Sequence, residues 1–246
     1  MNEIPKSHPR YKSLSERKLI EDGFEKGIIA KAGLIAHGRG ETFYYLLGEK
    51  TNKETKKQIN AAAAMLLLAK KPVLSVNGNT TALCAKEISV LSDSVPAEIE
   101  VNLFYKTPKR IKLIEKEFSK HGKKILGTKP TKKIHGLKSK RKDIDEKGQW
   151  EADVVLVMLE DGDRTEYLKK MGKKIIAIDL NPLSRTAQKA DITITDNVTQ
   201  CIPLLTEKII KLRKKSTKEL EEIIKNFKNK KILKKTEEQI RKGKMR

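Results

Sequence analysis

The chain has 246 residues, with 54 Lys or Arg against 32 Asp or Glu, so its formal net charge is +22. This length suits one large α/β domain, or one domain with an appendage. The longest apolar run, residues 61–69, is too short to cross a bilayer and no signal peptide opens the chain, so we expect a cytoplasmic protein without a membrane contact.

The cysteines and the positive charge give weaker indications. Cys84 and Cys201 lack a Cys or His neighbour at metal-ligand spacing, which predicts reduced, buried thiols. The charge raises nucleic acid as a partner, but the lysines are scattered and only 4% of residues are aromatic, too few to stack many bases. Nucleic-acid binding is therefore the less favoured interpretation; adaptation to heat or attraction of an anionic substrate explains the charge as well.

Residues 1–71 carry little strand pattern and are predicted to be helical. Ser13 is a plausible N-cap, with Glu16 completing a capping box. A loop with two glycines is expected around His37 and Arg39, and a helix follows over residues 53–70. Pro72 marks the change to a different pattern.

From residue 73, short apolar runs alternate with segments of helix length. The predicted strands are residues 73–76, 98–104, 124–126, 154–159, 174–178 and 192–194. Three strands, a long crossover over 127–150 and three more strands predict a Rossmann-like, doubly wound, mostly parallel six-stranded sheet in the order 3-2-1-4-5-6. We expect this domain to span residues 72–215, with residues 216–246 forming a basic helical tail that is solvated or contacts a second subunit.

Polar side chains follow the first predicted strand, at the edge where an open α/β sheet binds its ligands. The turn Asn77-Gly78-Asn79 opens a helix, whose N-terminus is a natural seat for a phosphate. Neither GxGxxG nor GxxxxGK[ST] is present, so no standard nucleotide fingerprint supports it. A ligand site and an ordinary strand–helix turn remain equally open from spacing alone.

In the expected glycine loop, His37 and Arg39 alternate with Gly38 and Gly40. Glycines permit a close backbone approach, and an arginine grips phosphate or carboxylate with two bonds. A loop that only turns the chain does not need His and Arg, so this pattern favours function.

Two acidic turns follow the fourth and fifth strands. After the fourth, Asp163 is expected to be a helix N-cap with Glu166 completing a capping box, which leaves Glu160 and Asp161 as possible ligands of Mg²⁺. After the fifth, Asp179, Leu180 and Asn181 could bind a ribose or a base edge. Arg185 and Thr186 lie one helical turn farther along and could reach a phosphate. The structural alternative there is N-capping by Asn181, with Pro182 at the first helical position.

Six segments together resemble the archaeal phosphopantothenate synthetases, also called 4-phosphopantoate–β-alanine ligases: SHPRYKSL, GLIAHGRGE, PVLSVNGNTTAL, EVNLFYKTPKR, ADVVLVMLEDGDRTEYLKKMGK and IDLNPLSRTAQKADITITDN. The similarity runs in order from Ile4 to Cys201 and leaves the tail outside. It implies an ATP-dependent ligase of coenzyme A biosynthesis, which condenses 4-phosphopantoate with β-alanine through an acyl-adenylate and releases AMP and pyrophosphate.

The same resemblance implies ATP, Mg²⁺ and a homodimer that meets through its N-terminal helices. By motif it assigns ATP contacts to Arg17, Arg39, Asp179, Leu180, Asn181, Arg185, Thr186, Asn197 and Val198. We further expect the acyl substrate or the transition state to contact His37, Asn77, Gly78, Asn79 and Arg164, with Arg39 and His37 catalytic. A non-catalytic nucleotide-binding regulator and a basic nucleic-acid-binding protein are the alternatives.

Overall fold

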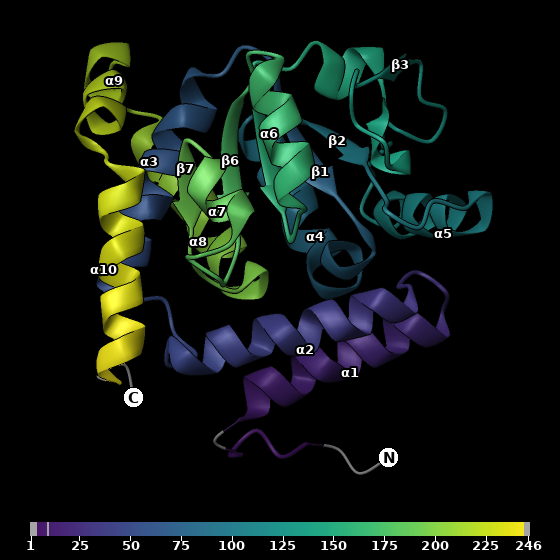
Figure 1. The fold of residues 1–246 in the computed structure, drawn as a ribbon, viewed down its shortest axis with the longest axis horizontal. Helices are drawn as coiled ribbons and strands as arrows, with labels where there is room; N and C mark the ends of the chain where they lie inside the picture. The colour runs from purple at the N-terminus through teal and green to yellow at the C-terminus, as the bar shows by residue number, and fades with distance from the viewer. Residues whose placement is uncertain (1–3, 9, 244–246) are drawn as a thin grey trace.

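The computed structural model describes residues 4–8 and 10–243, and one parallel sheet lies at its centre (Figure 1). Its strands are β1 (Pro72–Val76), β2 (Glu98–Val101), β5 (Val154–Met158), β6 (Lys174–Ile178) and β7 (Ile192–Ile194), in the order β2-β1-β5-β6-β7. Every neighbouring pair is parallel. The connections run outward in opposite directions from the adjacent strands β1 and β5, so the predicted doubly wound, Rossmann-like topology is confirmed.

The sheet has five strands, because the strand predicted over residues 124–126 is only a single parallel bridge between Glu100 and Leu126. Gly127 then turns the chain away at a φ of +80°. The crossover that follows contains a small antiparallel sheet of β3 (Lys132–Lys133) and β4 (Asp143–Ile144), and the short helices η1 (Lys140–Lys142) and η2 (Glu146–Trp150).

Both faces of the sheet are covered, which explains the continuous apolar runs. Val154, Leu156 and Met158 pack into one core, and Val155 and Val157 pack into another on the opposite face. The first core includes α3 (Lys53–Leu68), α4 (Gly78–Ser94), α5 (Pro108–Ser119) and α8 (Val198–Leu212); the second includes α6 (Gly162–Lys170) and borders α7 (Arg185–Lys189). The two cysteines are free and buried in the first core, as predicted.

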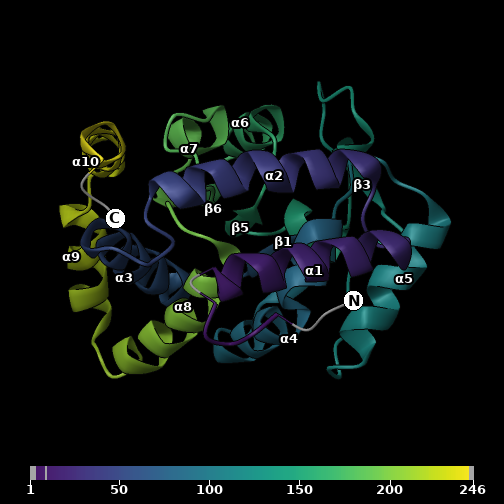
Figure 2. The same ribbon diagram turned by 90° about the horizontal axis from the view of Figure 1, so that it is seen from below.

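Helices α1 (Tyr11–Glu25) and α2 (Lys31–Leu46) form a hairpin across the carboxyl ends of the strands (Figures 1 and 2). Two local predictions are wrong here. Helix α1 begins before Ser13, whose hydroxyl donates to Glu49 instead of capping. The expected glycine loop is part of α2: each helical glycine costs about 1 kcal/mol relative to alanine, and burial of Tyr44 and Leu47 at the end of the helix offsets that cost.

The tail forms α9 (Thr217–Asn226) and α10 (Asn229–Lys242), and both pack on the body of the protein. Leu220 and Leu233 are buried, so each helix packs one face on the protein, while many of the other side chains of the tail are exposed to solvent as expected. The expected contact with a second subunit stays a prediction. Helix α10 runs beside α3, α7 and the edge strand β7 (Figure 1). Within the part of the chain that the structure describes, no helix has both the length and the apolar character to span a membrane.

Candidate active site

A cleft of about 720 Å³ lies between the carboxyl ends of the strands and the α1–α2 hairpin. Eleven of the residues expected to contact ATP or the acyl substrate line it: His37, Arg39, Asn77, Gly78, Asn79, Asp179, Leu180, Asn181, Arg185, Thr186 and Asn197. The Mg²⁺ candidates Glu160 and Asp161 line it as well. Arg17, Arg164 and Val198 are outside its wall. Segments that are as much as 160 residues apart in the sequence therefore meet at the point where the strand order reverses.

Asn77 organises the centre of the cleft. Its side-chain oxygen accepts from the backbone N–H groups of Asn79 (3.0 Å) and Thr80 (3.2 Å), so it caps α4. Its side-chain nitrogen donates to the carbonyl of Met158 at the end of β5 (2.8 Å). Leu159 comes next, with a left-handed φ of 52°, an uncommon conformation for a residue with a bulky side chain. One side chain thus holds a helix N-terminus against the end of the neighbouring strand.

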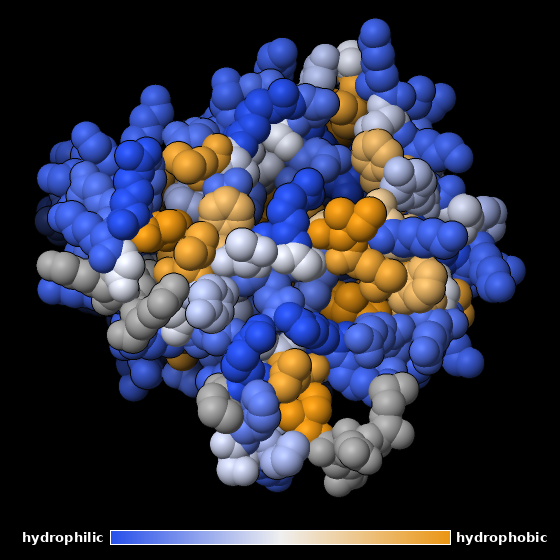
Figure 3. Space-filling model, turned by 60° about the horizontal axis from the view of Figure 1, so that its bottom comes forward, coloured by the Kyte–Doolittle hydropathy of each residue, from blue (hydrophilic) through white to orange (hydrophobic). Residues whose placement is uncertain are grey.

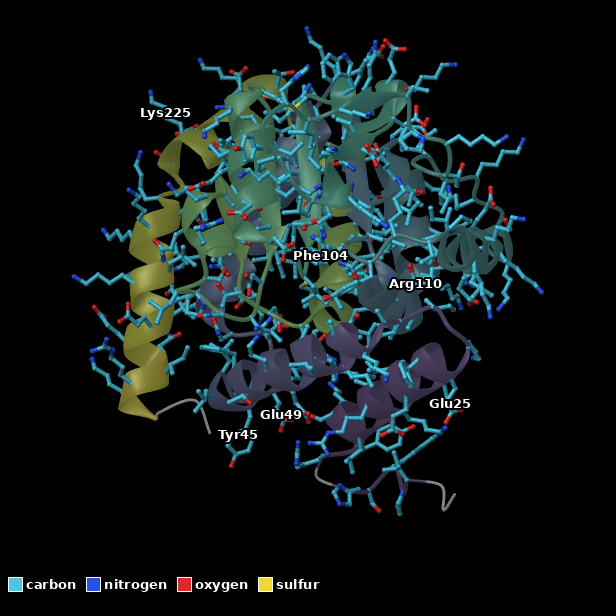
Figure 4. The ribbon with its side chains drawn as sticks, turned by 45° about the vertical axis from the view of Figure 1, so that its right-hand side comes forward. Glu25, Tyr45, Glu49, Phe104, Arg110 and Lys225 are labelled. Atoms are coloured by element: carbon cyan, nitrogen blue, oxygen red, sulfur yellow. The ribbon has the colours of Figure 1, made fainter. Side chains whose placement is uncertain are left out.

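The hairpin approaches this N-terminus closely at Gly78. A Cβ atom there would lie 2.5 Å from the carbonyl oxygen of Ile28 and 2.8 Å from Nη2 of Arg110. Arg110 donates to that same carbonyl through Nε (3.2 Å) and Nη2 (2.9 Å). Figure 4 shows Arg110 and Phe104 above the hairpin, at the end of the cleft away from Tyr45 and Glu49.

A buried ion network forms part of the wall through Glu160 and Arg141 and continues behind it to Arg164. Glu160 is paired with both Arg141, which lines the cleft, and Arg164, whose side chain is 1% exposed. Arg164 also donates to Ser75 Oγ (3.2 Å) and to Gln149. Burial lowers the pKa of each of these two arginines to about 10, so both remain charged at neutral pH. Arg164 therefore supports the wall of the cleft and does not form part of it.

The two ion pairs of Glu160 decide whether this residue can serve as a ligand of Mg²⁺. The carboxylate of Glu160 already faces two guanidinium groups, a poor fit for a metal ligand. Among residues 4–8 and 10–243 there is no group of three or more His, Cys, Asp or Glu side chains arranged to hold a metal. We therefore derive no step through a metal held by the protein.

The loop after β6 is held by hydrogen bonds around Asp179. This carboxylate accepts from the backbone N–H of Asn181 (2.9 Å) and from the hydroxyl of Ser184, and burial raises its pKa. Ser184 caps α7 by accepting from the N–H of Ala187 (2.9 Å), so the predicted cap at Asn181 is wrong. Thr186 donates to the carbonyl of Glu160 (2.7 Å). The loops after β5 and β6 are thereby joined.

At the start of α6 the structure also differs from the sequence prediction. The N-cap is Asp161, and Asp163 lies in the first turn, where it pairs with Arg185. An acidic side chain in the first turn is favourable because it faces the positive end of the helix.

Two residues predicted to contact ATP, Arg17 on α1 and Asn197 beside it, differ in their relation to the cleft: only Asn197 lines it. Arg17 is 45% exposed and pairs with Glu41 (2.9 Å), which also pairs with Arg10 (2.9 Å). Asn197 does line the cleft: it donates to Glu16 of α1 (2.7 Å) and caps α8 by accepting from Thr199 N (3.2 Å). Its neighbour Val198 is buried inside the first turn of α8.

His37 and Arg39 project from α2 into the wall of the cleft. Nε2 of His37 is buried and has no hydrogen-bond partner among the described residues. Burial is the main reason that the pKa of His37 lies below its usual value, so the imidazole is neutral at pH 7. A neutral imidazole inside a cleft can accept a proton.

Several lining residues were not expected at a site from the sequence: Phe104, Tyr105, Arg110 and Arg141, together with Glu16, which was expected only in a capping box. Phe104 and Tyr105 lie three and four residues after the carboxyl end of β2, so the strand-end rule that found Asn77 could have found them too. Arg141 lies in the long crossover, where no local pattern marks it. Only the folded chain brings it to the cleft.

A sequence profile described as phosphopantothenate/pantothenate synthetase matches residues 54–243, more than half of the chain. This chain belongs to that family. The 4-phosphopantoate–β-alanine ligase of Thermococcus onnurineus is 53% identical over 235 residues, which cover 95% of this chain and 90% of that protein.

Proteins with the same name extend the comparison. The one from Thermococcus kodakarensis is 51% identical over 95% of this chain and 90% of its own length, and that from Methanosarcina mazei is 44% identical over 95% and 92%. The predicted family resemblance is confirmed. Its predicted end at Cys201 is wrong, because the profile continues through α9 and α10 to residue 243.

Proposed function

We propose that this chain joins 4-phosphopantoate to β-alanine at the expense of ATP, giving 4'-phosphopantothenate for coenzyme A synthesis. The observation that carries the proposal is the identity of 44–53% to ligases of that name over nine tenths or more of both chains. A cleft at the switch point of the sheet, lined by arginines and by a helix N-terminus, suits a reaction between anions.

ATP is assigned to the end of the cleft formed by the loops after β6 and β7. Asp179, Leu180 and Asn181 would frame the ribose and base with Asn197, while Arg39, Arg185 and Thr186 face the phosphates. Val198 would contribute through its backbone, since its side chain is buried. Arg17 would join the phosphates only after leaving Glu41, because the two are now paired.

The acyl substrate is assigned to the opposite end. Asn77, Gly78 and Asn79 present the N-terminus of α4 there, and Arg110 and Arg141 supply positive charge for the carboxylate and phosphate of phosphopantoate. Arg164 acts indirectly in this arrangement, because it lies behind the wall and contacts Glu160, which lines the cleft.

The chemistry proposed is an acyl-adenylate route. The substrate carboxylate attacks the α-phosphorus of ATP, pyrophosphate leaves, and the amine of β-alanine then displaces AMP from the acyl carbon. Arg39 stabilises the charge that develops on the phosphate oxygens. Neutral His37 accepts a proton from the β-alanine nitrogen as the C–N bond forms, because the nitrogen becomes more acidic at that point. Mg²⁺ would arrive with the triphosphate, since this cleft provides no multidentate carboxylate site for it within the described residues.

A homodimer that meets through α1 and α2 is also proposed. Both helices expose large apolar side chains, of which Ile35 is 71% exposed and Leu19 is 42% exposed. Seen from this side, apolar side chains form several patches among hydrophilic ones (Figure 3). The molecular mass in solution, measured by light scattering for the native chain and for Ile35→Lys, tests this: we expect a dimer that the substitution weakens, and a monomeric native chain would contradict it.

The adenylate is tested by isotope exchange without β-alanine. If an acyl-adenylate forms, labelled pyrophosphate enters ATP when phosphopantoate is present and fails to enter when it is omitted. Absence of exchange in active enzyme would contradict the route. ATP binding without any exchange or product would instead favour a nucleotide-binding regulator, and nucleic-acid binding that persists at high salt would favour the remaining alternative.

A further inference from the structure

The tail helix α10 touches two of the segments to which ATP is assigned, α7 and the loop after β6, although it lies outside the cleft itself. Asn229, its first residue, contacts the end of α7, and Ile240, eleven residues later, packs near the loop after β6. At 1.5 Å per residue these two points are about 16 Å apart along one rigid helix. Helix α10 is seen beside α7 and β7 in Figure 1 and beside α7 and the end of α2 in Figure 2.

Both the oxygen and the nitrogen of the Asn229 side-chain amide form hydrogen bonds with the segment from α7 to β7. Its oxygen accepts from the backbone N–H of Thr193 in the edge strand β7 (2.9 Å). Its nitrogen donates to the carbonyls of Ala187 (3.2 Å) and Ala190 (3.1 Å) and to the hydroxyl of Thr193 (3.2 Å). These carbonyls belong to the C-terminal end of α7, which no longer has helical N–H groups to bind them.

Helix α7 needs such support because it has only five residues, Arg185–Lys189. A helix of this length is far below the roughly 12–15 residues at which isolated helices become even marginally stable. Its N-terminus is held by Ser184 from inside the cleft, and its C-terminus is held by Asn229 from the tail. The side chains of Arg185 and Thr186 extend from between these two anchors.

Ile240 provides the second contact. It packs against the cluster formed by Tyr44, Leu47 and Leu180. Leu180 belongs to the loop assigned to the ribose and base, and Tyr44 and Leu47 anchor the end of α2, which carries Arg39. Displacement of α10 would therefore loosen the nucleotide loop and α7 together.

We propose that α10 is a brace that positions the ATP-binding segments, with Asn229 and Ile240 as its positioning residues. The proposal rests on the ATP assignment made above. Neither residue touches ATP. Each one instead lowers the freedom of a segment that does, so that less conformational entropy is lost when ATP binds.

The test is the dissociation constant for ATP, measured by calorimetry on the full chain at a temperature where every variant is folded. For Asn229→Ala we expect ATP binding to weaken about tenfold, equivalent to about 1.4 kcal/mol. Asn229→Asp should not rescue binding, because its second carboxylate oxygen faces the carbonyls of Ala187 and Ala190. Ile240→Ala should weaken ATP binding as well, while the KM for β-alanine stays unchanged in all three variants.

Two further variants separate the possible outcomes. Lys234→Ala, at an exposed position of α10, is the matched control and should bind ATP normally. Arg185→Ala tests the ATP assignment itself. If it weakens ATP binding while Asn229→Ala and Ile240→Ala lower only the melting temperature, the brace is overturned and the assignment stands. If Arg185→Ala also binds ATP normally, the assignment at α7 fails and the brace fails with it.

Discussion

The side-chain nitrogen of Asn77 lies 2.8 Å from the carbonyl oxygen of Met158, so one amide joins the ends of the two central strands. The same side chain caps α4 through its oxygen. Asparagine can do both because it carries a donor and an acceptor on one short stem. This amide therefore fixes the geometry of the cleft at the carboxyl ends of β1 and β5, from which the chain connections run in opposite directions.

Replacement of Asn77 by alanine should reduce both stability and turnover. Loss of the cap and of the bond to the Met158 carbonyl should cost about 2–3 kcal/mol in the free energy of unfolding. Turnover should fall at temperatures where the variant remains folded, because the N-terminus of α4 and the end of β5 lose their connection. Urea denaturation and a steady-state assay measure the two effects. Ser216→Ala removes a cap of α9 instead and should lower stability alone; equal turnover in both variants would contradict a role for Asn77 in the site.

Arg39→Lys keeps the charge of the side chain but removes the planar fork of the guanidinium. We expect turnover to fall about 30- to 1,000-fold, corresponding to a loss of about 2–4 kcal/mol of transition-state stabilisation. The melting temperature should hardly change, because Arg39 is exposed on α2. Arg17→Ala is the companion variant, and near-normal turnover in both would refute the assignment of these arginines to ATP.

Two glycines next to the cleft should respond to alanine in opposite directions. At Gly78 the new methyl group would collide with the Ile28 carbonyl, so we expect a loss of about 1–3 kcal/mol in stability as the hairpin shifts. Gly38 has no atom within 4 Å of its Cβ position and lies inside α2, so alanine there should add about 0.5–1 kcal/mol. Chemical denaturation of the pair measures both; a stabilised Gly78→Ala variant would mean that the hairpin does not lie as described.

A strand of the sheet and the middle of α2 show which parts of the fold could be predicted from the sequence. Residues 154–158 form a continuous apolar run, and it predicted a strand covered on both faces because burial on two sides leaves no place for polar residues. Residues 37–41 were expected to form a loop because glycines alternate there with His37 and Arg39, a pattern that suits a close backbone approach to a ligand. The two glycines weaken a helix only locally. Packing of Tyr44 and Leu47, farther along the same helix, overrides that weakness.

The site residues divide in the same way: those marked by their position after a strand could be predicted, and those placed by tertiary packing could not. Asn77, Asp179 and Asn197 could be placed at one edge because parallel strands put their carboxyl ends together. For the arginines the sequence prediction was wrong, since it expected Arg164 at the substrate and did not single out Arg141. Which one reaches the cleft and which one lies behind Glu160 depends on how the crossover folds back over the sheet.

Asp196 should make the stability of the protein depend on pH. Burial is the main cause that raises its pKa from 3.8 to about 6, against hydrogen bonds from Thr51 and from the N–H of Asn197 that lower it. Between these two pH values the unfolded chain loses the proton while the folded protein keeps it. Stability should therefore fall as pH rises from about 4 to about 6, by about 3 kcal/mol for this group, and then level off.

The isosteric variant Asp196→Asn isolates this contribution. Its amide oxygen can still accept from Asn197 N, and its nitrogen can donate to the Thr51 hydroxyl, so the local structure should be kept. The difference in unfolding free energy between the variant and the native chain should grow from pH 4 to pH 6 in favour of the variant. A difference that stays constant over this interval would contradict the assignment.

The central claim is that the cleft activates a carboxylate by adenylation and then joins it to an amine. The most direct measurement is the product balance when the enzyme is incubated with ATP, Mg²⁺, 4-phosphopantoate and β-alanine, followed by phosphorus NMR. One AMP and one pyrophosphate should appear for each 4'-phosphopantothenate formed, and none should form when unphosphorylated pantoate replaces the substrate at the same concentration. Stoichiometric ADP and inorganic phosphate would contradict the account, because the carboxylate would then have been activated as an acyl phosphate.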